Sequence, residues 1–325
     1  MLFLVALLAG CASDNDISRL GQIDTFLQEG TDRVDVLWVV DDSISMSNEQ
    51  EKVAAGFQQF IVGMNMSEYA DFHMGIVTTD MDLSNPNRGL LVGDPPYLTR
   101  DDPYVGAFME RVMVGTEGSD KERGLQAAWA ALTDPDALAH NGDFIREDAE
   151  LALVFVSDEN DCSDENWLDD EQDGALCYNI TDKLVPTAEY IRQFQGLKGP
   201  GGRVVASAII GPPVNEGCEH SWPGKRYEAV AQELEGVQGN ICESDYQVIM
   251  DEIGAGISAP QRTFYLTYPA IEETLVVEVD SETVDPDGGA IWAYDPEYAK
   301  VDFTGEYVPE FGTTIDIAYD IAPSR

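Results

Sequence analysis

An aspartate and two serines follow the first strongly apolar run of the chain, at a spacing that suits a divalent cation. The apolar run covers residues 34–40, and Asp41-Asp42-Ser43-Ile44-Ser45 comes directly after it. A hard cation such as Mg²⁺ prefers oxygen ligands and keeps several waters. Two hydroxyls two residues apart on one turn can both face a cation, and the carboxylate beside them supplies charge. This pattern predicts a metal site.

Two other segments carry oxygen ligands that could reach the same place. Asp158 follows a second apolar run, residues 151–156. Ligands of open α/β sheets bind beyond the carboxyl ends of the strands, so both aspartates are expected at one crevice if their strands are close neighbours. A hydroxyl before the helix predicted at 123–132 is the third contribution, from either Ser119 or Thr116.

The elements that must position these residues alternate between strands and helices. Strands are predicted at 34–40, 72–79, 151–156 and 204–210, and helices after Ser47 and at 123–132, 187–194, 227–234 and 246–257. This order is typical of a doubly wound, mostly parallel sheet covered by helices on both faces. Ser47 followed by Gln50 predicts a capping box at the first helix, and residues 80–104 are predicted to form a long loop.

The layout resembles the von Willebrand factor type A family. Its metal-ion-dependent adhesion site has an Asp-x-Ser-x-Ser motif after the first strand, a Thr before a middle helix and an Asp after a later strand. The resemblance implies the ligands Asp41, Ser43, Ser45 and Asp158. Counting back from Leu125 places Ser119 on the family's Thr, with Thr116 three residues away. Asp42 and Ile44 stand where the family commonly has Gly.

The resemblance also implies a function. A domain of this family binds a protein or another acidic ligand through its metal, with an acidic group of the partner filling an open coordination position. Mg²⁺ is the expected metal, with Ca²⁺ or Mn²⁺ as alternatives. A structural scaffold of a cell-envelope complex, with a stabilising or empty site, is the competing function.

Charge and missing motifs exclude other functions. The net charge is −43, from 61 acidic and 18 basic residues. Nucleic acid is a poor partner because binding requires basic residues that neutralise phosphates. Adaptation to a salty habitat explains the charge equally well. None of the three histidines, His73, His140 and His220, lies in a His-Glu-x-x-His motif, and neither a Gly-x-Ser-x-Gly elbow nor a phosphate-binding loop is present. We therefore expect that the protein is not an enzyme.

The five cysteines predict an exported, lipid-anchored protein. Cys11 ends the apolar run 2–10, which resembles a bacterial lipobox and is too short to span a bilayer as a helix. The other four cysteines allow three pairings, of which we favour the local ones, Cys162–Cys177 and Cys218–Cys242, over free buried thiols. The expected location is the bacterial cell envelope. We expect the outer membrane, on its periplasmic or surface-facing side.

The chain is predicted to have four parts: a lipoprotein signal peptide with the lipobox (1–11), a tether (12–32), the von Willebrand factor type A-like domain (33–260) and a small all-β, sandwich-like module (261–325). Short strands separated by Gly-, Pro- and Asp-rich turns predict the last part.

Two questions stay open from the sequence. The acidic segment 158–173 is either a solvated loop pinned by Cys162–Cys177 or a Ca²⁺ site, although its spacing fits no EF-hand. Asp80 and Asp82 form a weaker Ca²⁺ candidate. Trp167 and Trp222 are either partner contacts or packed loop residues.

Overall fold

The computed structural model describes residues 21–28, 33–64, 71–169, 176–179, 181–198, 202–213, 218, 221–305, 307–310 and 312–323. The predicted signal peptide, its lipobox Cys11 and His220 lie outside these residues. Within them, no helix combines the length and apolar character needed to cross a membrane.

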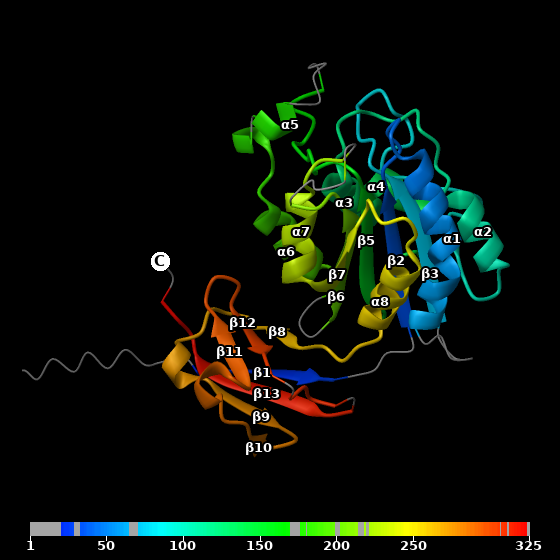
Figure 1. The fold of residues 1–325 in the computed structure, drawn as a ribbon. Coiled ribbons are helices and arrows are strands. Elements are labelled where there is room, and N and C mark those ends of the chain that lie inside the picture. The colour runs from blue at the N-terminus through cyan, green and yellow to red at the C-terminus, as the bar shows by residue number, and fades with distance from the viewer. Residues whose placement is uncertain are drawn as a thin grey trace, which may run out of the picture.

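A six-stranded sheet in the order β4-β3-β2-β5-β6-β7 forms the centre of the α/β domain (Figure 1). The strands are β2 (Arg33–Val40), β3 (Asp71–Thr78), β4 (Tyr97–Leu98), β5 (Glu150–Ser157), β6 (Val204–Ile210) and β7 (Glu235–Asn240). All neighbours are parallel except β4, which is antiparallel to β3. The chain builds the sheet outward from β2 in one direction and then, from β5, in the other. This order confirms the predicted doubly wound fold class.

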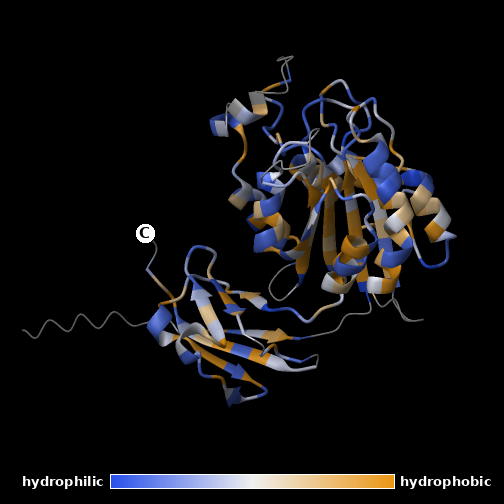
Figure 2. Cartoon of the chain, viewed as in Figure 1, coloured by the Kyte–Doolittle hydropathy of each residue, from blue (hydrophilic) through white to orange (hydrophobic). Residues whose placement is uncertain are grey.

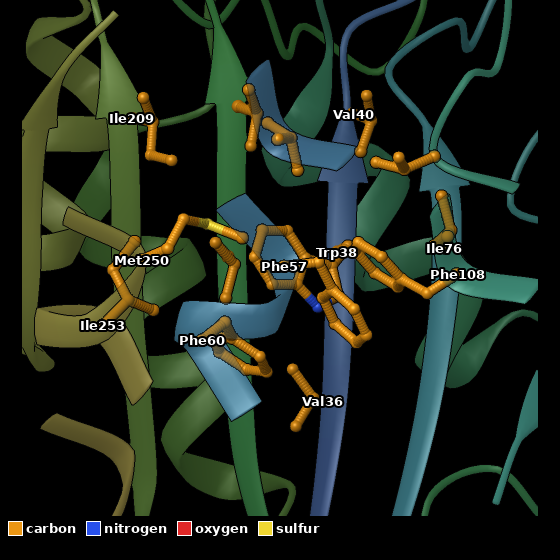
Figure 3. Close-up of a cluster of buried hydrophobic side chains, with 14 of the residues drawn as sticks. Val36, Trp38, Val40, Phe57, Phe60, Ile76, Phe108, Ile209, Met250 and Ile253 are labelled. Atoms are coloured by element: carbon orange, nitrogen blue, oxygen red, sulfur yellow. The ribbon is translucent and has the colours of Figure 1, made fainter. Parts of the chain in front are cut away.

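Helices cover both faces of this sheet. They are α1 (Ser47–Gly63), α2 (Tyr104–Arg111), α3 (Gly124–Thr133), α4 (Pro135–Asn141), α5 (Leu176–Asn179), α6 (Thr187–Gly196), α7 (Lys225–Glu233) and α8 (Gln247–Ile257), with a 3₁₀ turn at Thr181–Lys183. Alternate residues of β2 face opposite layers. The ring centroid of Trp38 lies 5.1 Å from those of Phe60 in α1 and Phe108 in α2 (Figure 3). On the other face, Leu37 and Val39 belong to the buried cluster formed with α3, α6 and α7.

Figure 2 shows why these strands form a central sheet. The inner strands β2, β5 and β6 are almost entirely hydrophobic, whereas the helices carry hydrophilic residues on their outer sides. In β2 every residue after Arg33 is buried, and β5 is buried after Glu150. A strand that is apolar on both faces is stable only between two covering layers.

Several elements differ from the sequence-based expectation, and helices α2 and α5 are among those that were not predicted. The predicted loop 80–104 contains the edge strand β4, and helix α4 follows an N-cap at Asp134, which accepts hydrogen bonds from Asp136 and Ala137. Strand β7 was not predicted because its sequence is polar and rich in glycine, and an edge strand with partly exposed residues does not require an apolar run.

The β module consists of two antiparallel sheets, β1-β13-β9-β10 and β11-β12-β8. The strands are β1 (Gly21–Leu27), β8 (Thr263–Tyr265), β9 (Val276–Val279), β10 (Glu282–Thr283), β11 (Trp292–Asp295), β12 (Lys300–Phe303) and β13 (Thr314–Asp320), with 3₁₀ turns at Glu272–Thr274 and Asp287–Gly289. One buried cluster joins the two sheets, and Phe26 lies 5.2 Å from Phe264 across it. The module is therefore sandwich-like.

The prediction of a tether at 12–32 is wrong for Gly21–Leu27. These residues form β1, which pairs with β13 along its whole length. Asp24 points inward and is 8% exposed, yet its carboxylate accepts hydrogen bonds from the Thr267 amide and the Tyr319 hydroxyl, both at 2.7 Å. A buried polar residue obscured the alternation of a strand, and the partner strand lies far along the chain.

The β module meets the α/β domain at the end of the sheet opposite the carboxyl ends of β2 and β5 (Figure 1). Glu233, at the end of α7, accepts hydrogen bonds from Lys300 and, through its carbonyl, from Tyr265 at 3.2 Å. Glu235, the first residue of β7, accepts one from the Thr263 hydroxyl. The module therefore contacts the base of the sheet and leaves the opposite edge open.

Candidate metal site

The crevice lies where the strand order reverses, between β2 and β5. Val40 pairs with Val156, and the Asp41 amide donates to the Val156 carbonyl at 3.0 Å. Asp41 and Asp158, which follow these two strands, are therefore brought to one edge of the sheet. Such a switch point is the usual ligand site of an open α/β sheet.

The turn after β2 fixes one carboxylate and two hydroxyls. Asp41 is fully buried; its Oδ1 accepts from the Ser43 amide at 2.7 Å and its Oδ2 from the Ser157 hydroxyl at 2.6 Å. The hydroxyls of Ser43 and Ser45 lie 3.2 Å apart. Both serines thus present their oxygens on the same side of the turn, as the Asp-x-Ser-x-Ser spacing predicts.

Gln50 connects this turn to the third loop. Its side-chain amide donates to the carbonyls of Asp41 and Gly115 at 2.9 and 2.8 Å, and its Oε1 accepts from the Gly115 amide at 3.3 Å. The predicted capping box is therefore wrong. Helix α1 has Met46 at its N-cap without a side-chain cap, because Gln50 makes these longer-range hydrogen bonds instead.

Gly118 holds the third loop against Asp42. Its amide donates to the Asp42 carbonyl at 2.8 Å, and a Cβ at this position would lie 2.3 Å from Asp42 Oδ1. Ser119 accepts from the Lys121 amide at 3.2 Å, and both Ser119 and Thr116 are half-buried. Among the described residues, no hydrogen bond joins either hydroxyl to the Asp41 turn.

Asp158 is buried and incompletely satisfied. It is 4% exposed, and its Oδ1 has no hydrogen-bond partner. Burial, together with the charge of Asp41, raises the pKa of Asp158 to about 7, although a hydrogen bond from Ser45 opposes the shift. The Ser45 contact places this carboxylate beside the serine pair.

Glu122 belongs to the site and was not predicted from the sequence. It is 1% exposed; its Oε2 accepts from the Thr79 hydroxyl, and its Oε1 has no partner. Burial and the charge of Asp41 raise its pKa well above the usual value, and burial also raises the pKa of Asp41. Glu122 stands between Lys121 and Arg123, a charged run that is typical of an exposed surface, so nothing in the sequence marked it.

Further carboxylates surround the crevice. Burial and the charges of Asp80 and Asp41 raise the pKa of Asp42 to about 7. Burial and the charges of Asp41 and Asp120 raise the pKa of Glu159 to about 7. In the described part of the chain, none of the ion pairs includes Asp41, Asp42, Glu122, Asp158 or Glu159.

These residues fit a hard divalent cation. Asp158 and Glu122 each leave an oxygen without a partner, and the paired hydroxyls of Ser43 and Ser45 lie beside Asp158. Within the described residues, no ion pair to a basic side chain compensates the charge of either carboxylate. Oxygen donors of this kind suit Mg²⁺ and Ca²⁺. No three acidic, His or Cys side chains of the described residues form a complete cage, so the serine hydroxyls and waters would complete the shell.

The acidic segment 158–173 is largely packed rather than solvated where the structure describes it. Asp164 is 1% exposed and contacts the fully buried Arg123 at 2.8 Å, and Asp82 and Asp169 contact the same guanidinium at 2.7 Å each. Asp161 pairs with Arg226 at 2.9 Å. These aspartates therefore neutralise arginines and pin the loops around α3, which argues against a Ca²⁺ site there.

Both favoured disulfides, Cys162–Cys177 and Cys218–Cys242, are present. The first lies in a small apolar cluster with Leu168 and Leu184. The second lies beside the crevice, where Cys242 lines an open hollow of 750 Å³ together with Ser45 and Asp158.

The rim of this hollow carries exposed apolar side chains. Ile44 is 87% exposed, and Trp222 is 54% exposed and lies 5.1 Å from the ring of Tyr178. Trp167 is 73% exposed and sits beside Lys183, away from the hollow. A partner that approaches the crevice would therefore meet Ile44 and Trp222.

The two described histidines have packing roles. His73 Nδ1 lies 2.9 Å from the Phe144 carbonyl, and His140 Nε2 lies 3.2 Å from the Leu91 carbonyl. Neither of these contacts involves Ser43, for which a nucleophilic role would require a nearby base.

Neither a family model nor a curated protein sequence matches the chain. Among solved structures, a von Willebrand factor type A protein from Catenulispora acidiphila is similar, with a TM-score of 0.43 and 16% identity over 94% of this chain and 65% of that one. The pilus adhesin SpaC from Lactobacillus rhamnosus GG has a TM-score of 0.40 and 12% identity, over 90% of this chain and 40% of that one. The adhesive tip pilin GBS104 from Group B Streptococcus agalactiae has a TM-score of 0.39 and 12% identity, over 95% of this chain and 83% of that one.

This chain thus spans less than two thirds of the first two proteins. The strand order β4-β3-β2-β5-β6-β7, with one antiparallel edge strand and a crevice at its reversal, is what makes the α/β domain doubly wound and von Willebrand factor type A-like.

Proposed function

We propose that this protein is an exported lipoprotein that binds a protein partner through a divalent cation held by Asp41, Ser43, Ser45 and Asp158. The observation that carries the proposal is the unpartnered, buried Oδ1 of Asp158 beside the serine pair, where no ion pair of the described residues compensates its charge. A bound cation would supply positive charge and an open coordination position for an oxygen of the partner. Mg²⁺ is the first choice, and Ca²⁺ and Mn²⁺ are alternatives.

The surroundings of the crevice support recognition rather than catalysis. An open hollow with an apolar rim, formed in part by Ile44 and Trp222, offers contact area next to the metal position. Exposed aromatic residues of this kind often dominate binding energy. We propose that an acidic side chain of the partner enters the crevice. We propose no catalytic role; ester or phosphate turnover that disappears in Ser43→Ala would contradict this.

The setting of the site is also a proposal. A lipid anchor at Cys11 would hold the protein to the bacterial envelope, in the outer membrane. Since β1 belongs to the β module, the anchored end of the chain would enter the module first, and the crevice would face away from it.

Thermal unfolding in EDTA and in Mg²⁺ tests the cation. At a Mg²⁺ concentration about 100 times Kd, the free energy of unfolding should rise by about 2.7 kcal/mol. Asp41→Ala should abolish the rise, whereas the exposed Asp143→Ala, away from the crevice, should retain it. A wild-type melting temperature that stays the same in Mg²⁺, Ca²⁺ and Mn²⁺ as in EDTA would refute the proposal.

A pull-down from envelope extract separates partner binding from the alternative of a scaffold. Metal-dependent binding predicts a partner that is retained in Mg²⁺ and lost both in EDTA and with Asp41→Ala. A scaffold with a stabilising cation predicts the same set of partners in all three cases.

A further inference from the structure

The two disulfides differ in their exposure to solvent. Cys162 and Cys177 are both buried, at 0% and 3% exposed, inside an apolar cluster. Cys218 is also buried, at 3% exposed, but its partner Cys242 is exposed and forms part of the wall of the 750 Å³ hollow beside the crevice. Of the four disulfide cysteines, Cys242 is therefore the one that a dissolved thiol reaches in the folded protein.

Access decides which sulfur of a disulfide is attacked. A thiolate that attacks Cys242 Sγ forms a new S–S bond there, while the bond to Cys218 breaks and its electron pair leaves with Cys218 as a thiolate. The Ser221 hydroxyl lies 2.6 Å from Cys218 Sγ and 3.7 Å from Cys242 Sγ, so it can donate a hydrogen bond to the leaving sulfur. The leaving thiolate then takes up the proton that the attacking thiol gave to the solvent.

The charges of the hollow distinguish between thiols. Glu49, Asp158 and Glu159 line it, and none of the described residues in its lining is basic. Lys52 contacts one oxygen of Glu49 at 3.5 Å, while the other oxygen, Oε2, is buried and has no hydrogen-bond partner. A concave surface with one sign of charge concentrates ligands of the opposite sign and raises their association rate. A thiol that carries positive charge is therefore the favoured reactant.

We propose that Cys242 is a thiol–disulfide exchange site and that its substrates are positively charged thiols, either small aminothiols or cysteines that lie between basic residues in a peptide. The reaction forms a mixed disulfide on Cys242 and a free thiol on Cys218. Attack of a second thiol on the mixed disulfide completes a two-electron reduction of the bond and oxidises the two thiols to their own disulfide. Exchange does not require a cation in the crevice, so the inference goes beyond the proposed function.

The intact bond joins two segments of the wall of the hollow. Cys218 comes shortly before Trp222 in the chain, Cys242 follows β7, and both Trp222 and Cys242 line the hollow. Exchange would break this link and place the incoming group on Cys242, within the same hollow as Trp222. A partner with a suitable cysteine would then be held covalently where it meets the rim.

Mass spectrometry of the full chain tests the position of exchange. The folded protein is treated with the aminothiol cysteamine, the reaction is quenched with acid, and free thiols are alkylated. We expect cysteamine on Cys242, the alkyl group on Cys218 and an intact Cys162–Cys177, which is the internal control because global unfolding exposes both disulfides alike. Equal reaction of both disulfides, cysteamine on Cys218 instead, or no reaction of the folded protein would overturn the inference.

Rates with thiols of different charge test the substrate class. Cysteamine is compared with the anionic 2-mercaptoethanesulfonate, and each rate is divided by the rate of the same thiol with a small uncharged disulfide. At low ionic strength we expect cysteamine to react about 10-fold faster or more, and the ratio to fall in about 1 M NaCl, which screens charges beyond about 3 Å. A ratio of one at low ionic strength would overturn the proposed charge preference.

A matched pair of variants tests the contribution of the hollow. Glu49→Gln should slow the reaction with cysteamine by about two- to threefold at low ionic strength, because one charge near the sulfur is lost. Glu51→Gln, exposed on the same helix and outside the lining of the hollow, should react as the wild type does. Equal rates for the two variants would show that the hollow does not attract the thiol.

Peptides separate the two sources of a charged thiol. A short peptide with cysteine between two arginines should link to Cys242 faster than the same peptide with two glutamates, which supports a protein substrate. Reaction with cysteamine but with neither peptide supports a small thiol. Either result is independent of the metal: a wild type that exchanges at Cys242 but has the same melting temperature in Mg²⁺ and EDTA supports this inference and contradicts the proposed function.

Discussion

The backbone amide of Trp222 donates a 2.7 Å hydrogen bond to the carbonyl oxygen of Asp158. This contact ties the loop that carries the Cys218–Cys242 disulfide to the residue with the unpartnered carboxylate oxygen. The indole of Trp222, half-exposed on the rim of the hollow, is thereby held next to the proposed cation position. Trp222 can report on an ion in the crevice and contact a partner there.

Sensitised terbium luminescence tests this proximity. Tb³⁺ is a hard cation that accepts oxygen ligands as Ca²⁺ does, and a nearby indole transfers excitation energy to it. Trp222→Phe should remove most of the tryptophan-sensitised emission, whereas Trp167→Phe, exposed but away from the hollow, should keep it. Excess Mg²⁺ should quench the wild-type signal by displacement. Equal emission from both variants would place the bound ion elsewhere.

Ser157 should act on the metal through Asp41. Its hydroxyl donates to Asp41 Oδ2 at 2.6 Å, so Ser157→Ala frees that carboxylate to rotate. We expect Mg²⁺ affinity to fall by about 10-fold or more while the protein stays folded. Ser207→Ala is the matched control. This serine of β6 is buried, its oxygen accepts from the Val237 amide at 3.0 Å, and within the described part of the chain it donates to no carboxylate. Titration calorimetry of both variants measures the difference; equal affinities would show that Asp41 needs no such support.

Gly118 should tolerate no side chain. A Cβ there would lie 2.3 Å from Asp42 Oδ1 and 2.8 Å from the Asp42 carbonyl oxygen, so Gly118→Ala must displace the third loop. We expect a loss of about 1–3 kcal/mol in the free energy of unfolding and weaker Mg²⁺ binding. Gly106 of α2 has open space around its Cβ position, and Gly106→Ala should stabilise the protein by about 0.5–1 kcal/mol. Chemical denaturation compares the two; a neutral Gly118→Ala would show that the loop is free to move.

Asp24 should make the β module sensitive to acid. Burial acts to raise its pKa, but hydrogen bonds from Thr267, Tyr319 and Gln22 outweigh burial, so the pKa lies below the usual 3.8. A lowered pKa in the folded state stabilises the protein above about pH 4, and this contribution is lost as the pH falls through the folded-state pKa.

Asp24→Asn should therefore cost about 1–3 kcal/mol at pH 7, with a smaller difference from the wild type at pH 3 and below. Glu282→Gln, an exposed position of the same sheet, should change little at either pH. Urea unfolding at several pH values provides the measurement. A cost for Asp24→Asn that stays constant from pH 7 to pH 2 would contradict the role of its charge.

The predictable parts of the fold are those with continuous apolar runs. The runs 34–40 and 151–156 correspond to β2 and β5. A strand that is buried on both faces needs apolar residues at successive positions, and such a run is visible in the sequence. β1 escaped prediction because its inward Asp24 breaks the apolar alternation and its partner β13 lies at the other end of the chain. Pairing over such a separation leaves no local trace.

The candidate site divides in the same way. The turn of Asp41, Ser43 and Ser45 is local, so its spacing could be seen in the sequence, and Asp158 followed once its strand was expected next to β2. Glu122 depends on the burial of a charged segment by two distant loops, which composition does not indicate. Gln50 was predicted to cap the helix locally. Its side-chain amide instead donates longer-range hydrogen bonds to the Asp41 and Gly115 carbonyls.

The pairing of β1 with β13 makes the α/β domain an insertion into the β module. Asp24 and Tyr319, which are hydrogen-bonded, are separated by 295 positions in the chain. At a synthesis rate of about 5–20 residues per second, β1 emerges roughly 15–60 s before its partner strand exists. During this interval the α/β domain, whose sheet contains neither strand, can complete its own core. We infer an order of assembly during translation in which the inserted domain folds first, and the module, made of the two outer segments, closes last.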